Sequence, residues 1–256
     1  MNHFATQPRL DLGDTPAGRA QLTNMALALR TMLDCQDAGQ EAPRMGLFYG
    51  FSGYGKTVAA AFTAARTGAA YVVAQSVWSQ RSLLEALAEE LGITRPERTV
   101  ARLLRQVIDQ LNHEPRPIII DEMDHLVQKR SVEIIRDIHD ATSIPILMIG
   151  EEALPVKLKE WERFDNRILI ATPAQPASPA DTLKLRDHYC TRVAVADDLA
   201  DMFRQRCKGI TRRIVTNLRA AQRLAAEEGV AEVDAAWWGS RPVANGDVPV
   251  RRREIA

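Results

Sequence analysis

The stretch "GFSGYGKT", residues 50–57, follows the apolar run Leu47-Phe48-Tyr49 and precedes an alanine-rich, helix-forming segment. It fits the pattern GxxxxGK[ST], in which glycines let successive backbone N–H groups turn around a phosphate with no Cβ in the way. A strand before the loop and a helix after it would also place the positive end of a helix at the phosphate. The sequence therefore predicts a phosphate-binding loop made of Gly50, Phe51, Ser52, Gly53, Tyr54, Gly55, Lys56 and Thr57.

Two side chains at the end of this loop have specific roles in phosphate chemistry. Lys56 is placed to reach the β- and γ-phosphates of a nucleotide, and the hydroxyl of Thr57 is a ligand for Mg²⁺. Such a loop needs a second strand that carries a carboxylate, and the run Ile118-Ile119-Ile120 ends in Asp121-Glu122, 65 residues beyond Lys56. We expect Asp121 to hold Mg²⁺ through water and Glu122 to deprotonate the attacking water. The pair therefore favours hydrolysis over phosphoryl transfer to a metabolite.

The composition limits what the chain can be. Its 256 residues suffice for one large domain or for a medium domain with a small one. The 33 basic and 33 acidic residues balance, so no global field favours nucleic acid or membrane. Three cysteines lie far apart with no CxxC spacing, which indicates reduced thiols rather than disulfides or a metal site. Without a signal pattern or an apolar run of ~18 residues, we expect a cytoplasmic protein that does not contact membranes.

Apolar segments alternate with amphipathic helical patterns over the first two thirds of the chain. We expect a helix from Thr15-Pro16 to about Leu33, because apolar residues recur there at helical spacing. The expected strands are residues 46–49, 70–74, 117–120, 144–149 and 167–171. The expected helices between them are residues 56–66, 82–91, 100–111 and 132–139. This alternation indicates an α/β fold with a parallel sheet.

The residue pattern changes at residues 172–179, which hold three prolines and cannot form a helix interior. After them come only helical patterns, at residues 181–188, 197–207 and 211–227, with a short one at 234–238. We therefore expect a boundary near Pro176. The expected parts are an N-terminal segment and helix (1–40), an ATPase core (41–176), a small all-helical lid (177–240) and a basic tail (241–256).

The chain resembles the AAA+ ATPases of transposition, most closely the group of phage Mu transposition protein B, with TnsC-like regulators as wider relatives. The likeness covers roughly residues 20–235. Beside the phosphate loop, it is carried by "DEMDHL" (121–126), "ILMIG" (146–150), and "GITR" (209–212) followed by "NLR" (217–219). The resemblance implies a three-layer parallel-sheet core followed by a helical lid, with ATP bound between adjacent protomers.

The resemblance also implies roles for three arginines. Arg167 is the first candidate, and Arg163 the second, for a residue that reaches the γ-phosphate held by the next protomer. Their i, i+4 spacing leaves open that they merely pair with Glu160 or Glu162. Arg212 is the expected lid residue that contacts phosphate, the alternative being a solvated lid arginine.

Two features depart from the pattern of these relatives. A polar residue that senses the γ-phosphate usually follows the fourth strand, and here that position holds Glu151. A glutamate could orient water, but it would repel the γ-phosphate unless it is paired or screened. The relatives also often carry an N-terminal helix-turn-helix domain, and only about 40 residues precede the first strand here. We therefore expect any contact with DNA to come from the ATPase body.

Basic residues are concentrated in a few places. Residues 202–223 carry seven positive charges and no acidic residue, which suits either phosphate contacts or a solvated lid surface. The candidates for contacts with the DNA backbone are Arg81, Arg98, Arg102, Arg105, Lys129 and Arg130. Without interleaved aromatic residues, we expect contacts to duplex phosphates with little base readout.

The resemblance implies an ATP-dependent protein that assembles on double-stranded DNA as a filament or ring, selects target sites and stimulates a partner transposase. Such a protein would be encoded by a phage or mobile element and act in the cytoplasm of the bacterial host. A helicase-loader-like ATPase of the IstB or DnaC type is the alternative, and preference for duplex over single strands would separate the two. A small-molecule kinase is disfavoured by Glu122.

Overall fold

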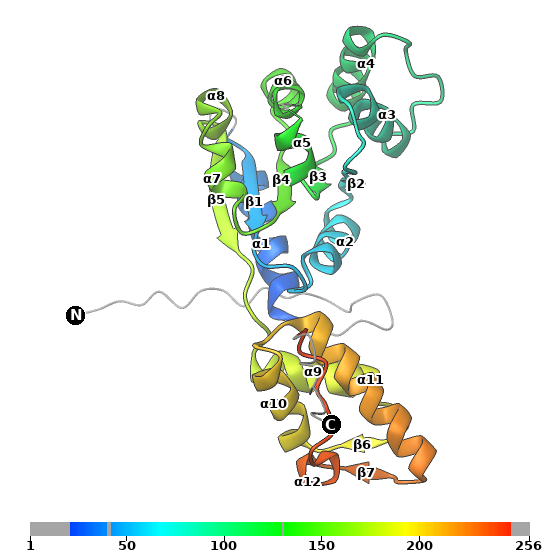
Figure 1. The fold of residues 1–256 in the computed structure, drawn as a ribbon. Helices are drawn as coiled ribbons and strands as arrows, with labels where there is room; N and C mark the ends of the chain where they lie inside the picture. The colour runs from blue at the N-terminus through cyan, green and yellow to red at the C-terminus, as the bar shows by residue number, and fades with distance from the viewer. Residues whose placement is uncertain (1–20, 40–41, 130, 247–256) are drawn as a thin grey trace, which may run out of the picture.

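The computed structural model describes residues 21–39, 42–129 and 131–246. Figure 1 shows a sheet with helices on both faces, joined by one connection to a second part made mostly of helices. In the described residues, no helix is long and apolar enough to cross a membrane.

Five parallel strands form the sheet in the order β2-β3-β4-β1-β5. They are β1 (Met45–Tyr49), β2 (Ala70–Val73), β3 (Ile118–Asp121), β4 (Ile146–Gly150) and β5 (Ile168–Pro173). The central strands β3 and β4 are buried at every position, as expected where helices cover both faces of a parallel sheet. The expected α/β fold with a parallel sheet is confirmed.

Alternate residues of each strand face opposite helical layers. Phe48 and Ile149 pack with α1 (Thr23–Asp37) and α2 (Lys56–Thr67) on one face. Leu47 and Met148 pack on the other face in a larger apolar core. The helices of that second layer are α3 (Gln80–Glu90), α4 (Val100–His113), α5 (Asp124–Gln128), α6 (Val132–Thr142), α7 (Leu154–Leu158) and α8 (Glu162–Asp165). The result is the three-layer core that the resemblance implies.

The first helix differs from its expected bounds. It begins at Thr23 and continues to Asp37, whereas the expected helix runs from Thr15-Pro16 to Leu33. Residues 15 and 16 lie outside the described part of the chain. Leu22 has extended backbone angles, and the backbone N–H of Thr23 donates to the carboxylate of Asp181, 2.8 Å away. Because the cap comes from a residue 158 positions later, local sequence rules could not locate this helix start.

The second part has its own apolar core, which includes Phe203, Leu218 and Trp238. Its helices are α9 (Pro179–Tyr189), α10 (Asp197–Arg206), α11 (Thr211–Glu228) and α12 (Ala235–Trp238). It is not purely helical as expected, because β6 (Ala194–Val195) and β7 (Glu232–Val233) form a short parallel pair. The segments before α10 and after α11 lie side by side there, so their backbone groups satisfy one another.

The first turn of α1 ties the two parts together. The amide of Asn24 donates to the carbonyls of Tyr54, at 2.9 Å, and Gln175, at 2.8 Å, and it accepts the N–H of Gln175. Next to it, the buried carboxylate of Asp181 also accepts hydrogen bonds from the hydroxyl of Thr23. The phosphate loop, the connection and α9 therefore share one anchor.

We predict that Asp181→Asn destabilises the protein by about 1–3 kcal/mol at pH 7, because buried N–H and O–H donors lose their charged acceptor. Burial alone would raise the pKa of Asp181, but hydrogen bonds from Thr23 and Ser178 outweigh burial and hold the pKa below its ordinary value. This stabilisation is therefore present above the unfolded pKa of about 3.9 and is lost as the pH falls through the folded pKa. Urea unfolding at several pH values measures it.

The matched control is Asp187→Asn, which changes an exposed carboxylate on the same helix. We expect it to change stability by less than about 0.5 kcal/mol. A difference between wild type and Asp181→Asn that stays constant down to pH 3 would contradict the role given to the carboxylate charge.

Candidate nucleotide-binding site

The loop between β1 and α2 has the backbone shape that a phosphate requires. Gly53 and Gly55 have φ angles of 85° and 86°, in the left-handed region that glycine adopts without strain. A Cβ on Gly53 would also lie 2.7 Å from the Cγ2 atom of Ile210, at the start of α11. The loop therefore needs glycine at position 53 both for its own turn and for the close approach of the second part.

Lys56 lies at the first position of α2 and folds back over the loop. Its ammonium donates to the carbonyls of Gly50, at 2.6 Å, and Phe51, at 3.0 Å. Burial lowers the pKa of Lys56, while the carboxylates of Glu122 and Asp121 act in the opposite direction. Phosphate oxygens could replace these two carbonyls as acceptors, so the loop and Lys56 together fit a phosphate group.

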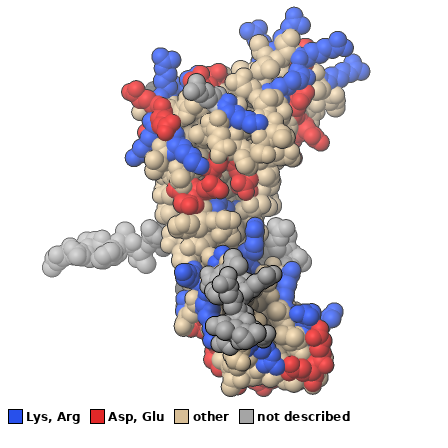
Figure 2. Space-filling view, viewed as in Figure 1, with Lys and Arg blue, Asp and Glu red and all other residues tan. Residues whose placement is uncertain are grey.

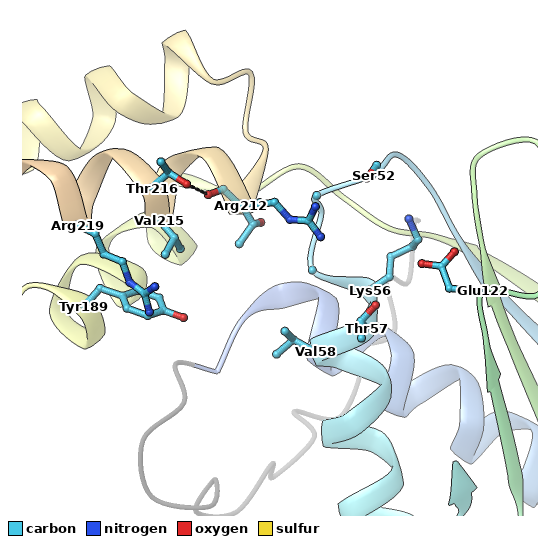
Figure 3. Close-up of a pocket in the computed structure, with 13 residues that line it drawn as sticks. Ser52, Lys56, Thr57, Val58, Glu122, Tyr189, Arg212, Val215, Thr216 and Arg219 are labelled. Atoms are coloured by element: carbon cyan, nitrogen blue, oxygen red, sulfur yellow. Dashed lines mark hydrogen bonds between the residues drawn. The ribbon is translucent and has the colours of Figure 1, made fainter. Parts of the chain in front are cut away.

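The two carboxylates after β3 have different surroundings. Asp121 is buried, and its oxygens accept hydrogen bonds from the Tyr71 hydroxyl, at 3.2 Å, and the N–H of Glu122, at 2.9 Å. Burial, together with the nearby Asp121 carboxylate, raises the pKa of Tyr71, so its hydroxyl remains a donor. Glu122 has a φ angle of 55°, which is rare and strained for a residue with a side chain. In Figure 3 its carboxylate faces Lys56 across the pocket.

A third carboxylate, Asp124, has no specific role in the sequence-based prediction, and the structure shows why it matters. It is almost fully buried; it accepts the N–H of Glu151 at 2.7 Å and the ammonium of Lys157 at 2.7 Å. Lys157 also lies 3.8 Å from the carboxylate of Glu151. Its hydrogen bond to Asp124 raises the pKa of Lys157 against the effect of burial.

Lys157 lies beside the exposed Glu151, which occupies the position expected for the sensor of the γ-phosphate. A bare carboxylate there would repel phosphate, but Lys157 supplies a positive charge beside it. Gly150 is required at the preceding position, because a Cβ there would collide with the carboxylate of Asp124. One sequence signal points to the pairing of Asp124 with Lys157. A buried carboxylate such as that of Asp124 needs a partner, and Lys157 lies on the helix that follows Glu151.

The second part of the molecule closes the pocket from the other side. The backbone N–H of Arg212 donates to the carbonyl of Gly53 at 3.1 Å, and the Arg212 side chain extends toward the loop (Figure 3). The cavity between them has a volume of about 340 Å³, within the range of small-molecule sites. At its far end the guanidinium of Arg219 stacks over the ring of Tyr189, 4.6 Å from the centroid. Sequence patterns did not single out Tyr189, Val58 or Val215, which also line this cavity.

Residues 40–158 match a family model described as an AAA domain, and this range contains the loop, both carboxylates after β3, and Lys157. Over these residues the chain is similar to an AAA domain. The chain is also similar to the Mu-like prophage FluMu DNA transposition protein B of Haemophilus influenzae, with 28 % identity over 163 residues. That match covers 60 % of this chain and 56 % of the relative, so the chain spans only about half the length of that protein.

Solved structures with the same fold extend the likeness beyond the AAA domain. The Orc1 protein of Aeropyrum pernix in complex with DNA has a TM-score of 0.61 at 18 % identity, covering 86 % of this chain and 63 % of its own. Cdc6p from Pyrobaculum aerophilum has a TM-score of 0.61 at 15 % identity, covering 86 % and 66 %. RuvB of Thermotoga maritima has a TM-score of 0.55 at 16 % identity, covering 84 % and 65 %. These likenesses show the fold.

The two candidate arginines before β5 do not line this cavity in their own chain. The guanidinium of Arg167 donates to both carboxylate oxygens of Asp140, at 2.9 and 2.8 Å, and to the carbonyl of Arg163, at 2.6 Å. Its partner is thus Asp140 on α6, not Glu160 or Glu162. The side chain of Arg163 is exposed, and within the described residues nothing pairs with it.

The candidates for DNA contacts fall into two places on the part that contains the five-stranded sheet. Arg81 is already engaged, because its guanidinium donates to the carbonyl of Arg98 and pairs with Glu85 at 2.8 Å. Arg98, Arg102 and Arg105 are exposed around the start of α4. Lys129 is exposed at the end of α5, and Arg130 lies outside the described residues.

We predict that Lys157→Met lowers stability by about 1–3 kcal/mol, because it leaves the buried carboxylate of Asp124 without its positive partner. Adding Asp124→Asn should restore part of the loss, since a neutral side chain at position 124 needs no counter-charge. Urea denaturation of the single and double variants measures both effects, with Lys159→Met as the control on a nearby exposed lysine. The interpretation is wrong if Asp124→Asn makes the Lys157 variant less stable still.

Proposed function

We propose that this protein is an ATPase that assembles on double-stranded DNA in the presence of ATP, selects target DNA and activates a partner transposase. The observation that carries the proposal is the placement of Glu122 opposite Lys56 in one pocket, with Arg212 closing it. The direction toward transposition comes from the similarity to the Mu-like transposition protein B, which has DNA transposition in its name.

The residues of the pocket fit ATP with Mg²⁺. Lys56 and the N–H groups at the start of α2 suit the β- and γ-phosphates, and Arg212 reaches the loop from the other side. Thr57 and Asp121 are oxygen donors of the kind that Mg²⁺ prefers, and the ion would neutralise phosphate charge. No group of three or more metal-binding side chains occurs in the described residues, which agrees with an ion held largely by phosphates and water. Glu122 would accept the proton of the attacking water.

Assembly of several copies would complete the site. Arg163 is exposed, unpaired among the described residues and does not line the nucleotide pocket of its own chain, so it suits a role at the pocket of a neighbouring copy. Arg167 would fix the position of Arg163, because it binds the Arg163 carbonyl while Asp140 holds its other side. The pairing of Arg167 makes Arg163 the better candidate for direct contact with the γ-phosphate.

We predict that Glu122→Gln binds ATP like the wild type but hydrolyses it at least about 10²-fold more slowly, because the general base is lost. Assembled protein should then persist on duplex DNA.

Lys56→Ala should fail to bind ATP. Nucleotide binding, steady-state hydrolysis and electron microscopy with a DNA duplex measure these outcomes. Normal turnover by Glu122→Gln would refute its role, and a preference for single strands would favour the helicase-loader alternative.

A mixing experiment tests whether Arg163 acts on a neighbouring copy. We predict that Arg163→Ala binds ATP normally but loses at least about 10³-fold in assembly-stimulated turnover. Lys56→Ala is inactive for a different reason and keeps its own Arg163. A mixture of the two inactive variants should recover part of the activity, since each supplies what the other lacks. A mixture as inactive as its components would show that Arg163 does not act between copies.

A further inference from the structure

The connection between α3 and α4, with the first turns of α4, carries four arginines that the nucleotide site does not use. We call them the hairpin patch: Arg95, Arg98, Arg102 and Arg105. All four are exposed, and none forms an ion pair within the described residues. Figure 2 shows basic side chains projecting from this end of the molecule, and Figure 1 shows α3 and α4 at the opposite end from α12.

The lack of partners sets these arginines apart from many others in the chain. Arg30, Arg81, Arg136, Arg167, Arg186, Arg204, Arg223 and Arg241 each pair with a carboxylate. Within residues 95–105 the single acidic residue is Glu97, so this segment has a net charge of +3. Like charges held this close repel one another, and a bound polyanion would relieve that repulsion.

The structure holds the backbone of the patch in place. Arg81 donates to the carbonyl of Arg98 and is itself paired with Glu85. The side-chain amide of Gln106 donates to the carbonyl of Arg95, at 3.0 Å, and accepts the N–H of Glu97, at 2.9 Å. The connection is therefore fixed from both sides. A ligand that binds here would lose less conformational entropy than one that must order a flexible loop.

The chemistry of the patch favours phosphate over an acidic protein. Guanidinium groups match phosphate oxygens with two parallel hydrogen bonds. Protein interfaces depend on buried aromatic or aliphatic anchors, and the exposed large apolar side chains of the described residues all lie elsewhere. We propose that the hairpin patch binds the phosphate backbone of duplex DNA, independently of ATP. The choice of duplex rests on the proposed function, whereas the independence from ATP follows from the separation of the patch from the pocket.

The test measures binding of the full chain to a fluorescent DNA duplex of about 24 base pairs without nucleotide, at several salt concentrations between 50 and 200 mM. Each phosphate contact contributes about 0.9 to the slope of log K against log salt. Arg98→Gln with Arg102→Gln should therefore lower the slope by about 2 and weaken binding. The control, Arg66→Gln with Lys159→Gln, removes two exposed charges from other parts of the fold and should leave the slope unchanged. Thermal unfolding checks that every variant is folded.

A third variant tests the fixed backbone. Gln106→Ala keeps all four arginines but releases the connection, so binding should weaken while the slope stays that of the wild type. The Lys56→Ala background separates the patch from ATP-dependent assembly. If the patch binds DNA without ATP-dependent assembly, Arg98→Gln with Arg102→Gln also weakens binding and lowers the salt slope in the Lys56→Ala background.

Three results would overturn the proposal. The first is an unchanged slope and affinity in Arg98→Gln with Arg102→Gln while ATP still promotes DNA binding, which would leave the proposed function intact. The second is binding of poly-L-glutamate but not duplex, which would assign the patch to an acidic protein. The third is no binding of duplex by the wild type in any nucleotide state, which would remove the proposed function as well.

Discussion

The parallel pairing of β1 with β4 determines where everything else in the site lies. In that register Tyr49 is opposite Gly150, and the N–H of Gly50 donates to the Gly150 carbonyl at 3.2 Å. Because β3 pairs with β4 as well, the residues that follow these three strands meet at one edge of the sheet. A slip of one residue would turn Phe48 and Ile149 to the wrong apolar layer, so burial on both faces enforces this alignment.

The chain is neutral as a whole, yet its charges are strongly organised. Some charges have a specific partner: the buried Asp124 pairs with Lys157, and the half-buried Arg167 pairs with Asp140. The first pair supports the backbone of Glu151, and the second holds the segment before β5. Substituting either partner would leave a charge uncompensated. Arg163 and the hairpin patch, by contrast, lie on the surface, and none of them forms an ion pair within the described residues. The division separates groups that hold the fold from groups available to bind another molecule.

Sequence reasoning succeeded where a local pattern has one physical meaning. The phosphate loop, the apolar strand before Asp121 and the alternation of strands and helices are such patterns, and the five-stranded parallel sheet follows from them.

Prediction from the sequence failed where the deciding contact joins distant segments. The cap of α1 comes from Asp181, the β6–β7 pair joins segments some 38 positions apart, and Lys157 reaches back to Asp124 across 33 positions. No rule based on neighbouring residues contains that information. The pairing of Arg167 with Asp140, 27 positions away, eluded prediction for the same reason.

The hydrogen bond from the Arg212 N–H to the Gly53 carbonyl attaches the first turn of α11 to the phosphate loop, so a movement of the loop would tilt the helix about this contact. The helix has 18 residues and is about 27 Å long at 1.5 Å per residue. A tilt of about 5° at this contact would move its distant end by roughly 2 Å, as the dimensions of a straight helix require. The loop and the start of α11 are closely packed at this contact, because a Cβ on Gly53 would clash with Ile210. Small adjustments of the loop would therefore be amplified into displacements at the outer surface of the helical part.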